Sequence, residues 1–190
     1  MLIGLHGKKR SGKDTAAMLI TQWANKNGIE ARQDAFARRL KISASRALGF
    51  LGEDEDCDKL CDLLKEDSLI KVSIGSKNAW EISGREYLQY YGTEAHREVF
   101  DVDFWVNTTL GSKFKHEDEI VIITDVRFAN EAEAVHKLDG DVIEIVRGYD
   151  DSDTHASEQR IPKDLIDRSI ENNGTIEALR VSLNDFLEGR

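Results

Sequence analysis

The sequence has little proline and no long apolar run. One proline stands among 190 residues, and no stretch is low in complexity or internally repeated. No apolar run is long enough to span a bilayer, and the N-terminal run is too short for a secretory signal. We therefore expect no membrane segment and a cytoplasmic location.

Cysteine is equally scarce, with only Cys57 and Cys61. They lie four residues apart, on the helical face that also carries Leu60 and Leu64. This spacing predicts two buried thiols in an apolar stripe. A metal site or disulfide is the alternative, and its partners would have to come from distant segments. So few cysteines are typical of a reducing compartment.

Positive charge is in short supply as well. Lys and Arg number 26 against 36 Asp and Glu, which gives a formal net charge of −10. This balance argues against broad binding to nucleic acid or anionic membranes. A chain of 190 residues, 40% of them hydrophobic, can bury one sizeable core in a single domain with insertions.

The chain does have a glycine-rich loop between a short apolar run at 2–5 and a predicted helix. Gly7 and Gly12 are spaced as in the phosphate-binding pattern G-x-x-x-x-G-K-S/T. Such glycines let backbone N–H groups point at a phosphate, and the following helix adds its positive end. Lys13 would reach the β- and γ-phosphates. The predicted nucleotide-binding loop comprises Gly7, Lys8, Lys9, Arg10, Ser11, Gly12, Lys13, Asp14 and Thr15.

Asp14 departs from this pattern, because Ser or Thr normally stands there and holds Mg²⁺. Thr15 follows one position later. A carboxylate also suits a hard cation. We therefore name Asp14 and Thr15 as candidate metal ligands, with a helix-capping role as the alternative for Asp14.

Hydrophobic periodicity predicts alternating strands and helices. Strands are expected near 2–5, 29–35, 119–124, 141–146 and 166–170. Helices are expected to begin near 13, to cover 36–51 and 130–138, and to begin again near 176; the helix with the two cysteines is expected to end near 66. A hairpin at 69–82 precedes a capping box at 83–86 and a helix that breaks at Gly92-Thr93. The pattern predicts an α/β fold with about five parallel strands, helices on both faces and a mostly helical insertion.

Ligands of such sheets lie at the carboxyl ends of the strands. Asp125 follows an apolar strand there and could hold Mg²⁺ or only cap a helix. Arg127 could pair with a phosphate or form a surface salt bridge. Asp34 could accept a substrate hydroxyl or be a solvated turn acid. Asn172 reaches the same edge.

Other candidates lie farther along the chain. Arg97, in the insertion, is a candidate phosphate ligand, and Lys41 is a second that could equally be an exposed helix lysine. The polar segment from Arg147 to Arg160 contains His155 and could close over phosphates as a lid, or be an ordinary surface loop.

Several stretches, taken in order, resemble the deoxynucleoside monophosphate kinases of bacteriophages. They are the loop at 7–15, Leu88-Gln-Tyr-Tyr-Gly-Thr93, Asp103-Phe-Trp-Val106, Thr124-Asp-Val-Arg127, Asp153-Thr-His155 and Asn172-Asn-Gly-Thr175. The resemblance implies a three-layer P-loop kinase fold over 1–190, with a nucleoside monophosphate-binding insertion at 36–100 and a lid at 147–162. It also implies ATP as donor, Mg²⁺, a deoxynucleoside 5′-monophosphate as acceptor and, for a phage protein, the host cytoplasm.

The resemblance also assigns roles to residues. It places Arg10, Lys13 and Asp14 in the donor loop, Asp125 and Arg127 in the cleft, and Asn173 and Gly174 on the adenine side. The expected catalytic residues are Lys13, Arg10, Asp125 and Arg127; the substrate-binding residues are Asp34, Lys41, Arg97, Arg127 and His155; and the metal ligands are Asp14, Thr15 and Asp125.

Two other functions stay open. The Gly-Lys-Asp loop also resembles animal phosphomevalonate kinases, so the loop alone does not name the acceptor. A non-catalytic ATP-dependent switch protein is the second alternative. A polynucleotide kinase is disfavoured by the negative charge. The striped helices and the family likeness are compatible with a homodimer.

Overall fold

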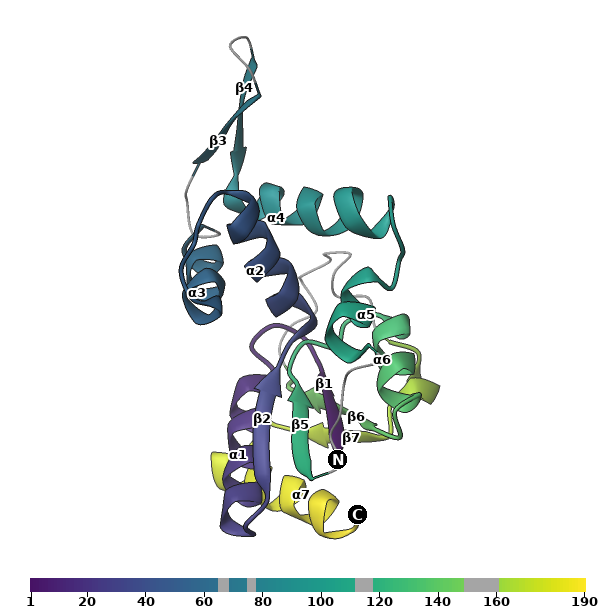
Figure 1. Cartoon of the computed structure of the whole chain (residues 1–190). Coiled ribbons are helices and arrows are strands. Elements are labelled where there is room, and N and C mark those ends of the chain that lie inside the picture. The colour runs from purple at the N-terminus through teal and green to yellow at the C-terminus, as the bar shows by residue number, and fades with distance from the viewer. Residues whose placement is uncertain (65–68, 75–77, 112–117, 149–160) are drawn as a thin grey trace. The chain divides into compact units, whose positions relative to one another are not determined.

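The computed structural model describes residues 1–64, 69–74, 78–111, 118–148 and 161–190 (Figure 1). The chain divides into two compact units. The first unit consists of Met1–Ala35 and Leu110–Arg190, and the second of Phe36–Thr109. The second unit thus begins where the insertion was expected to begin and extends nine residues beyond 100.

The first unit is built on a five-stranded sheet with the order β2-β5-β1-β6-β7. All neighbouring strands are parallel. The predicted α/β class with about five parallel strands is therefore confirmed. The strands are β1 (Leu2–His6), β2 (Glu30–Asp34), β5 (Glu119–Ile123), β6 (Asp141–Val146) and β7 (Arg168–Glu171).

Helices cover both faces of this sheet. Strand β1 is buried throughout and β5 nearly so, as expected for strands with a helix layer on each side. On one face, α1 (Lys13–Lys26) and α7 (Ile176–Glu188) enclose a core with Ile3, Leu5 and Ile122. On the other lies α6 (Ala129–His136), close to Gly4. A Cβ at Gly4 would lie 2.9 Å from Cγ2 of Val126, so glycine permits this close packing.

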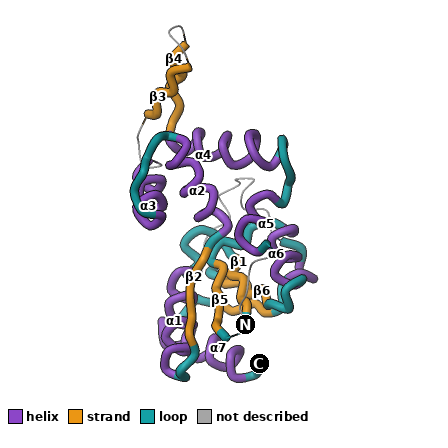
Figure 2. Tube along the Cα trace, in the orientation of Figure 1, coloured by secondary structure: helices purple, strands orange, loops and turns teal. Residues whose placement is uncertain are grey.

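The second unit contains α2 (Phe36–Ala47), α3 (Asp54–Leu64), α4 (Gly84–Gly92), the π-helix η1 (Thr93–Arg97) and most of α5 (Phe104–Leu110), as Figure 2 shows. Strands β3 (Leu69–Ile74) and β4 (Asn78–Ser83) pair antiparallel, which confirms the predicted hairpin. The capping box is also confirmed. The Ser83 hydroxyl accepts from the Glu86 N–H, and the Glu86 carboxylate accepts from the Ser83 N–H.

Two predicted boundaries were wrong for local reasons. Helix α2 ends at Ala47 rather than near 51, because Gly49 adopts a left-handed φ of 86° and the N–H of Phe50 bonds back to Ser45 O. Strand β7 begins at Arg168 rather than 166, because the N–H of Ile166 still bonds back to Lys163 O in the 3₁₀ turn η3 (Lys163–Leu165).

The break expected at Gly92-Thr93 does not occur. The chain continues from α4 directly into η1, so the helix widens instead of stopping. The indole N–H of Trp105 donates to Gly92 O at 2.9 Å. Arg97 is half-buried at the end of this turn.

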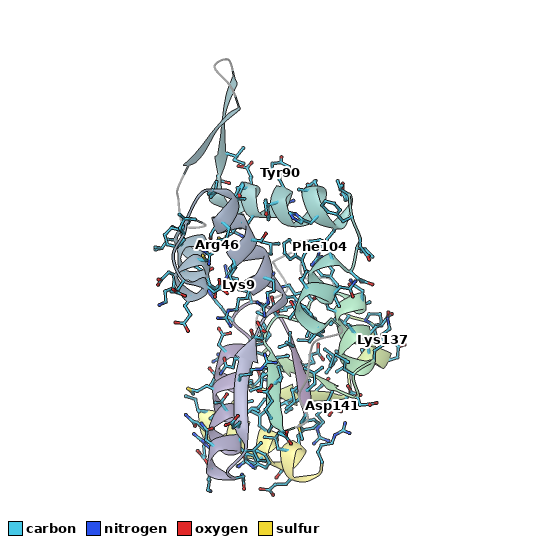
Figure 3. The ribbon with its side chains drawn as sticks, in the orientation of Figure 1. Lys9, Arg46, Tyr90, Phe104, Lys137 and Asp141 are labelled. Carbon is cyan, nitrogen blue, oxygen red and sulfur yellow. The ribbon has the colours of Figure 1, made fainter. Side chains whose placement is uncertain are left out.

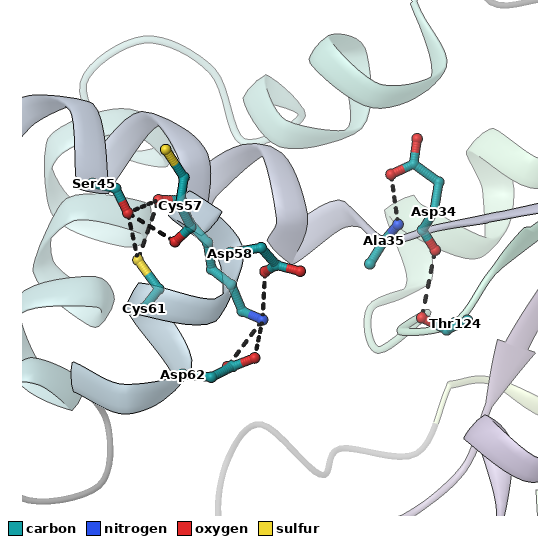
Figure 4. A network of polar contacts seen from close by, with 9 residues as sticks. Asp34, Ala35, Ser45, Cys57, Asp58, Cys61, Asp62 and Thr124 are labelled. Atoms are coloured by element: carbon teal, nitrogen blue, oxygen red, sulfur yellow. Dashed lines mark hydrogen bonds and ion pairs between the residues drawn. The ribbon is translucent and has the colours of Figure 1, made fainter. Parts of the chain in front are cut away.

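The two cysteines are free and fully buried, as predicted. Figure 4 shows them beside Ser45. The Cys61 thiol lies 3.1 Å from the Ser45 hydroxyl and donates to Lys41 O at 3.2 Å. These contacts join α2 to α3 and give the thiols a structural role.

Candidate functional site

The carboxyl ends of the five strands lie along one edge of the sheet. Register pairs Asp34 with Ile123, His6 with Glu144, and Val146 with Glu171. The loops that follow these strands therefore leave from the same edge, as predicted for a ligand site. This edge carries the glycine-rich loop, Asp34, the turn at 124–128, the exit of β6 and the loop after β7.

The glycine-rich loop has a backbone that requires its glycines. Gly7 and Gly12 have φ of 143° and 104°, which side chains rarely tolerate. A Cβ at Gly7 would lie 2.5 Å from Ile145 O and 2.8 Å from the Ser11 hydroxyl oxygen. Arg10 also has a positive φ of 64°, so the loop turns through three left-handed residues.

Lys13 begins helix α1 and folds back over the loop. Its ammonium donates to Gly7 O at 2.7 Å and to Lys8 O at 2.8 Å. A cation is therefore fixed across the loop, in contact with the carbonyls of residues 7 and 8. Lys9, in the same loop, has an exposed side chain that adds positive charge at its surface (Figure 3).

The start of α1 is free of side-chain caps. Gly12 stands at the N-cap, and no described side chain accepts a capping hydrogen bond there. The exposed Asp14 lies in the first turn and does not cap it. Ser11 is 3% exposed, and its buried hydroxyl has no partner among the described residues. The N-terminus of a helix that starts at a glycine, an orphaned hydroxyl and a cation together suit a phosphate.

Asp34 is a buried acid at the end of β2. Its side chain is 5% exposed. One oxygen accepts from the Ala35 N–H at 2.9 Å (Figure 4), and the other lies 3.4 Å from the Arg32 guanidinium. Its carbonyl accepts from the Thr124 N–H at 3.0 Å, which ties β2 to the turn after β5.

The turn carrying Asp125 and Arg127 is fixed from two sides. The Val126 N–H donates to Leu5 O at 3.1 Å, and Val126 O lies 2.9 Å from Nδ1 of His6. Asp125 is half-buried and Arg127 exposed.

Glu131, which was not among the predicted site residues, holds the other side of this turn. It is only 2% exposed, and its carboxylate accepts from the N–H groups of Arg127 at 2.7 Å and Phe128 at 3.1 Å. An acid in the first turn of α6 is the sequence signal that could have indicated it.

The loop after β7 touches the glycine-rich loop. The side-chain amide of Asn172 donates to Ser11 O at 2.8 Å. Asn173 accepts from the Gly148 N–H at 2.7 Å, next to the end of β6. Thr175 caps α7 by accepting from the Ala178 N–H at 3.2 Å. Asn173 and Gly174 thus lie in a loop attached to the glycine-rich loop through Asn172.

Two predicted substrate residues belong to the second unit. The Lys41 ammonium lies between two carboxylates, 2.8 Å from Asp58 and 3.0 Å from Asp62; Figure 4 labels both aspartates. Burial alone would lower the pKa of Lys41, but the hydrogen bonds and charges of both aspartates outweigh it and raise the pKa. Arg97 ends the π-helix η1. In the same turn, the ring centroid of His96 lies 4.5 Å from that of Tyr91, with the two rings tilted by 46°.

His155 and most of the segment 147–162 lie outside the described residues. Within the described ranges, no group of three or more His, Cys, Asp or Glu side chains could hold a metal ion. No helix of the described chain is long and apolar enough to cross a membrane.

Comparison with known proteins gives a consistent result. The family model for deoxynucleotide monophosphate kinase matches residues 25–183. The deoxynucleoside-5′-monophosphate kinase of Escherichia phage T5 is 28% identical over 99% of this chain and 96% of its own length. The deoxynucleotide monophosphate kinase of Escherichia phage RB69 is 27% identical over 66% of this chain and 52% of its own.

A solved structure supports the fold. Shikimate kinase from Aquifex aeolicus aligns with a TM-score of 0.50 and 16% identity, covering all of this chain and 97% of that one. The first unit therefore has the three-layer fold of P-loop kinases, as the sequence predicted.

Proposed function

Because the chain belongs to the deoxynucleotide monophosphate kinase family, we propose that it transfers the γ-phosphoryl group of ATP to a deoxynucleoside 5′-monophosphate. The products are ADP and a deoxynucleoside diphosphate. The observation that carries the proposal is the family match over 25–183. The residues before the match include the glycine-rich loop, where the Lys13 ammonium donates to the carbonyls of Gly7 and Lys8.

On the donor side, the loop at 7–15 binds the phosphates. Lys13 exchanges the carbonyls of Gly7 and Lys8 for phosphate oxygens, and Arg10 adds charge from the loop. Binding costs little rearrangement, because the left-handed glycines already set the turn. Asn173 and Gly174 take the adenine side, in the loop attached to Ser11.

Asp14, Thr15 and Asp125 are the proposed contacts for Mg²⁺. A magnesium ion in such kinases usually keeps several waters and is held by one or two carboxylates together with phosphate oxygens. These three side chains fit that requirement, because they supply two carboxylates and one hydroxyl. Among the described residues, no group of three or more His, Cys, Asp or Glu side chains could hold a metal ion by itself. When bound, Mg²⁺ neutralises phosphate charge.

On the acceptor side, we propose that the insertion at 36–100 binds the monophosphate and that 147–162 closes as a lid. Asp34, Lys41, Arg97, Arg127 and His155 are the proposed contacts. Arg127 is exposed and held by its backbone, so its guanidinium can reach a phosphate. Lys41 would have to leave Asp58 and Asp62 before it could bind one.

The proposed transfer is in line, without a covalent enzyme intermediate. The acceptor phosphate is already an ionised nucleophile, so no strong general base is needed. This chain contributes by positioning the two nucleotides, neutralising charge with Lys13 and Arg127, and excluding water that would otherwise hydrolyse ATP. We further propose a cytoplasmic location, which suits two free buried thiols, and assembly as a homodimer.

The test is ADP release measured in a coupled assay over a panel of acceptors. The panel contains deoxynucleoside monophosphates, ribonucleoside monophosphates and a phosphorylated non-nucleotide such as phosphomevalonate. We expect at least one deoxynucleoside monophosphate to accelerate ADP release well above the rate with ATP alone. Acceleration by the non-nucleotide alone, or by no acceptor, would contradict the proposal.

A further inference from the structure

Asn172 links the loop after β7 to the glycine-rich loop. The residue is only 9% exposed, although it is polar. Its backbone N–H donates to Val146 O at 2.7 Å, which fixes the residue to the end of β6. Its side-chain amide then reaches back to Ser11 O at 2.8 Å.

The bonded carbonyl belongs to the Ser11–Gly12 peptide. A trans peptide is planar, so its C=O and N–H point in opposite directions. By holding the carbonyl of Ser11, Asn172 therefore also fixes the Gly12 N–H to the side of the peptide away from Asn172. Backbone N–H groups of this kind make the anion-binding concavity of a phosphate loop.

A side chain at position 12 would displace the Asn172 amide from Ser11 O. A Cβ there would collide with the side-chain nitrogen of Asn172. Glycine at position 12 thus permits two things: the left-handed φ of 104° and the close approach of the Asn172 side chain. The neighbouring Asn173 continues the link by accepting from the Gly148 N–H.

We propose that Asn172 is a positioning residue that keeps the Ser11–Gly12 peptide in its phosphate-binding orientation. The proposal rests on the donor half of the proposed function. Asn172 does not bind the base itself. It determines how well the loop binds the phosphate chain of the donor.

The test compares Asn172→Asp and Asn172→Ala with the unaltered full-length chain by calorimetry. Asn172→Ala removes the N–H donor without adding charge, so its loss of affinity reports the hydrogen bond; Asn172→Asp keeps the shape and loses the donor but also adds a negative charge. Inorganic tripolyphosphate probes the loop, and adenosine probes the base site. One neutral hydrogen bond corresponds to a change in affinity of about 3- to 10-fold. We therefore expect tripolyphosphate affinity to fall by at least about 3-fold and adenosine affinity to stay within about 2-fold.

Asn27→Asp is the matched control. The Asn27 amide also donates to a backbone carbonyl, Trp23 O at 2.8 Å, but at the opposite end of α1. Its removal should leave both affinities unchanged. Hydrogen exchange gives a readout that needs no ligand. We expect faster exchange of the amides at 8–13 in the Asn172 variants, without faster exchange in β1.

Unchanged tripolyphosphate affinity would overturn the proposal. An equal loss of adenosine and tripolyphosphate binding would also overturn it, because that result means a base contact or a general loss of structure. Failure of the acceptor assignment is distinguishable, since it would appear in the acceptor panel while tripolyphosphate binding and exchange at 8–13 still responded to Asn172.

Discussion

Replacing Glu131 tests whether the turn with Asp125 and Arg127 is fixed by a buried carboxylate. Glu131 is 2% exposed and accepts two backbone N–H groups, at 2.7 and 3.1 Å. Hydrogen bonds to a charged group contribute about 1.5–3 kcal/mol each, and the cost of burying the carboxylate offsets part of the sum. We expect Glu131→Ala to lower the free energy of unfolding by about 2–4 kcal/mol.

Glu131→Gln separates stability from function. The amide oxygen can still accept, but as a neutral group, so we expect a loss of about 1–2 kcal/mol. Urea unfolding followed by circular dichroism measures both variants. Under conditions where Glu131→Gln stays folded, we expect its kcat to fall more than its KM for ATP rises. The loosened turn contains Asp125 and Arg127, whereas the glycine-rich loop that binds ATP is unchanged.

Glu133→Gln is the control on the same helix. Glu133 is exposed, so its replacement should change stability by less than about 0.5 kcal/mol. If Glu131→Ala were as stable and as active as this control, the carboxylate would not hold the turn. The positioning argument for Asp125 and Arg127 would then fail.

Three further predictions concern single side chains. Lys13→Ala should remove most turnover while circular dichroism stays that of the unaltered chain, and full activity would refute the loop assignment. Asp14→Ser restores the usual loop pattern; a shifted Mg²⁺ titration is expected if Asp14 contacts the metal, and an unshifted curve would refute that role. Lys41→Met should be less stable than the unaltered chain below the unfolded-state lysine pKa of about 10.4. Since the folded pKa of Lys41 is raised, this difference should vanish as pH rises through it, and a difference that persists above it would contradict the ion-pair account.

The sheet and the loop could be predicted because their signals are local. The continuous apolar run at 119–124 and the glycine spacing at 7 and 12 depend on neighbouring residues only. The strand–loop–helix order then placed Asp34, Asp125 and Asn172 at one edge, which the parallel register confirms.

Contacts between distant segments could not be predicted. The bond from Asn172 to Ser11 joins residues 161 positions apart, and no periodicity encodes it. The same holds for Lys41, whose partners Asp58 and Asp62 follow from the packing of α2 on α3. The π-helix was missed because a glycine before threonine normally indicates a helix end. Here the Trp105 indole bonds to Gly92 O, and the chain continues in a wider helical turn.

Transfer of label from [γ-³²P]ATP tests the central claim most directly. With a deoxynucleoside monophosphate as acceptor, the account predicts that the label appears in the deoxynucleoside diphosphate, one per ADP formed, and that Lys13→Ala removes most of this transfer. Label found only in inorganic phosphate, or in a product other than the diphosphate, would contradict it.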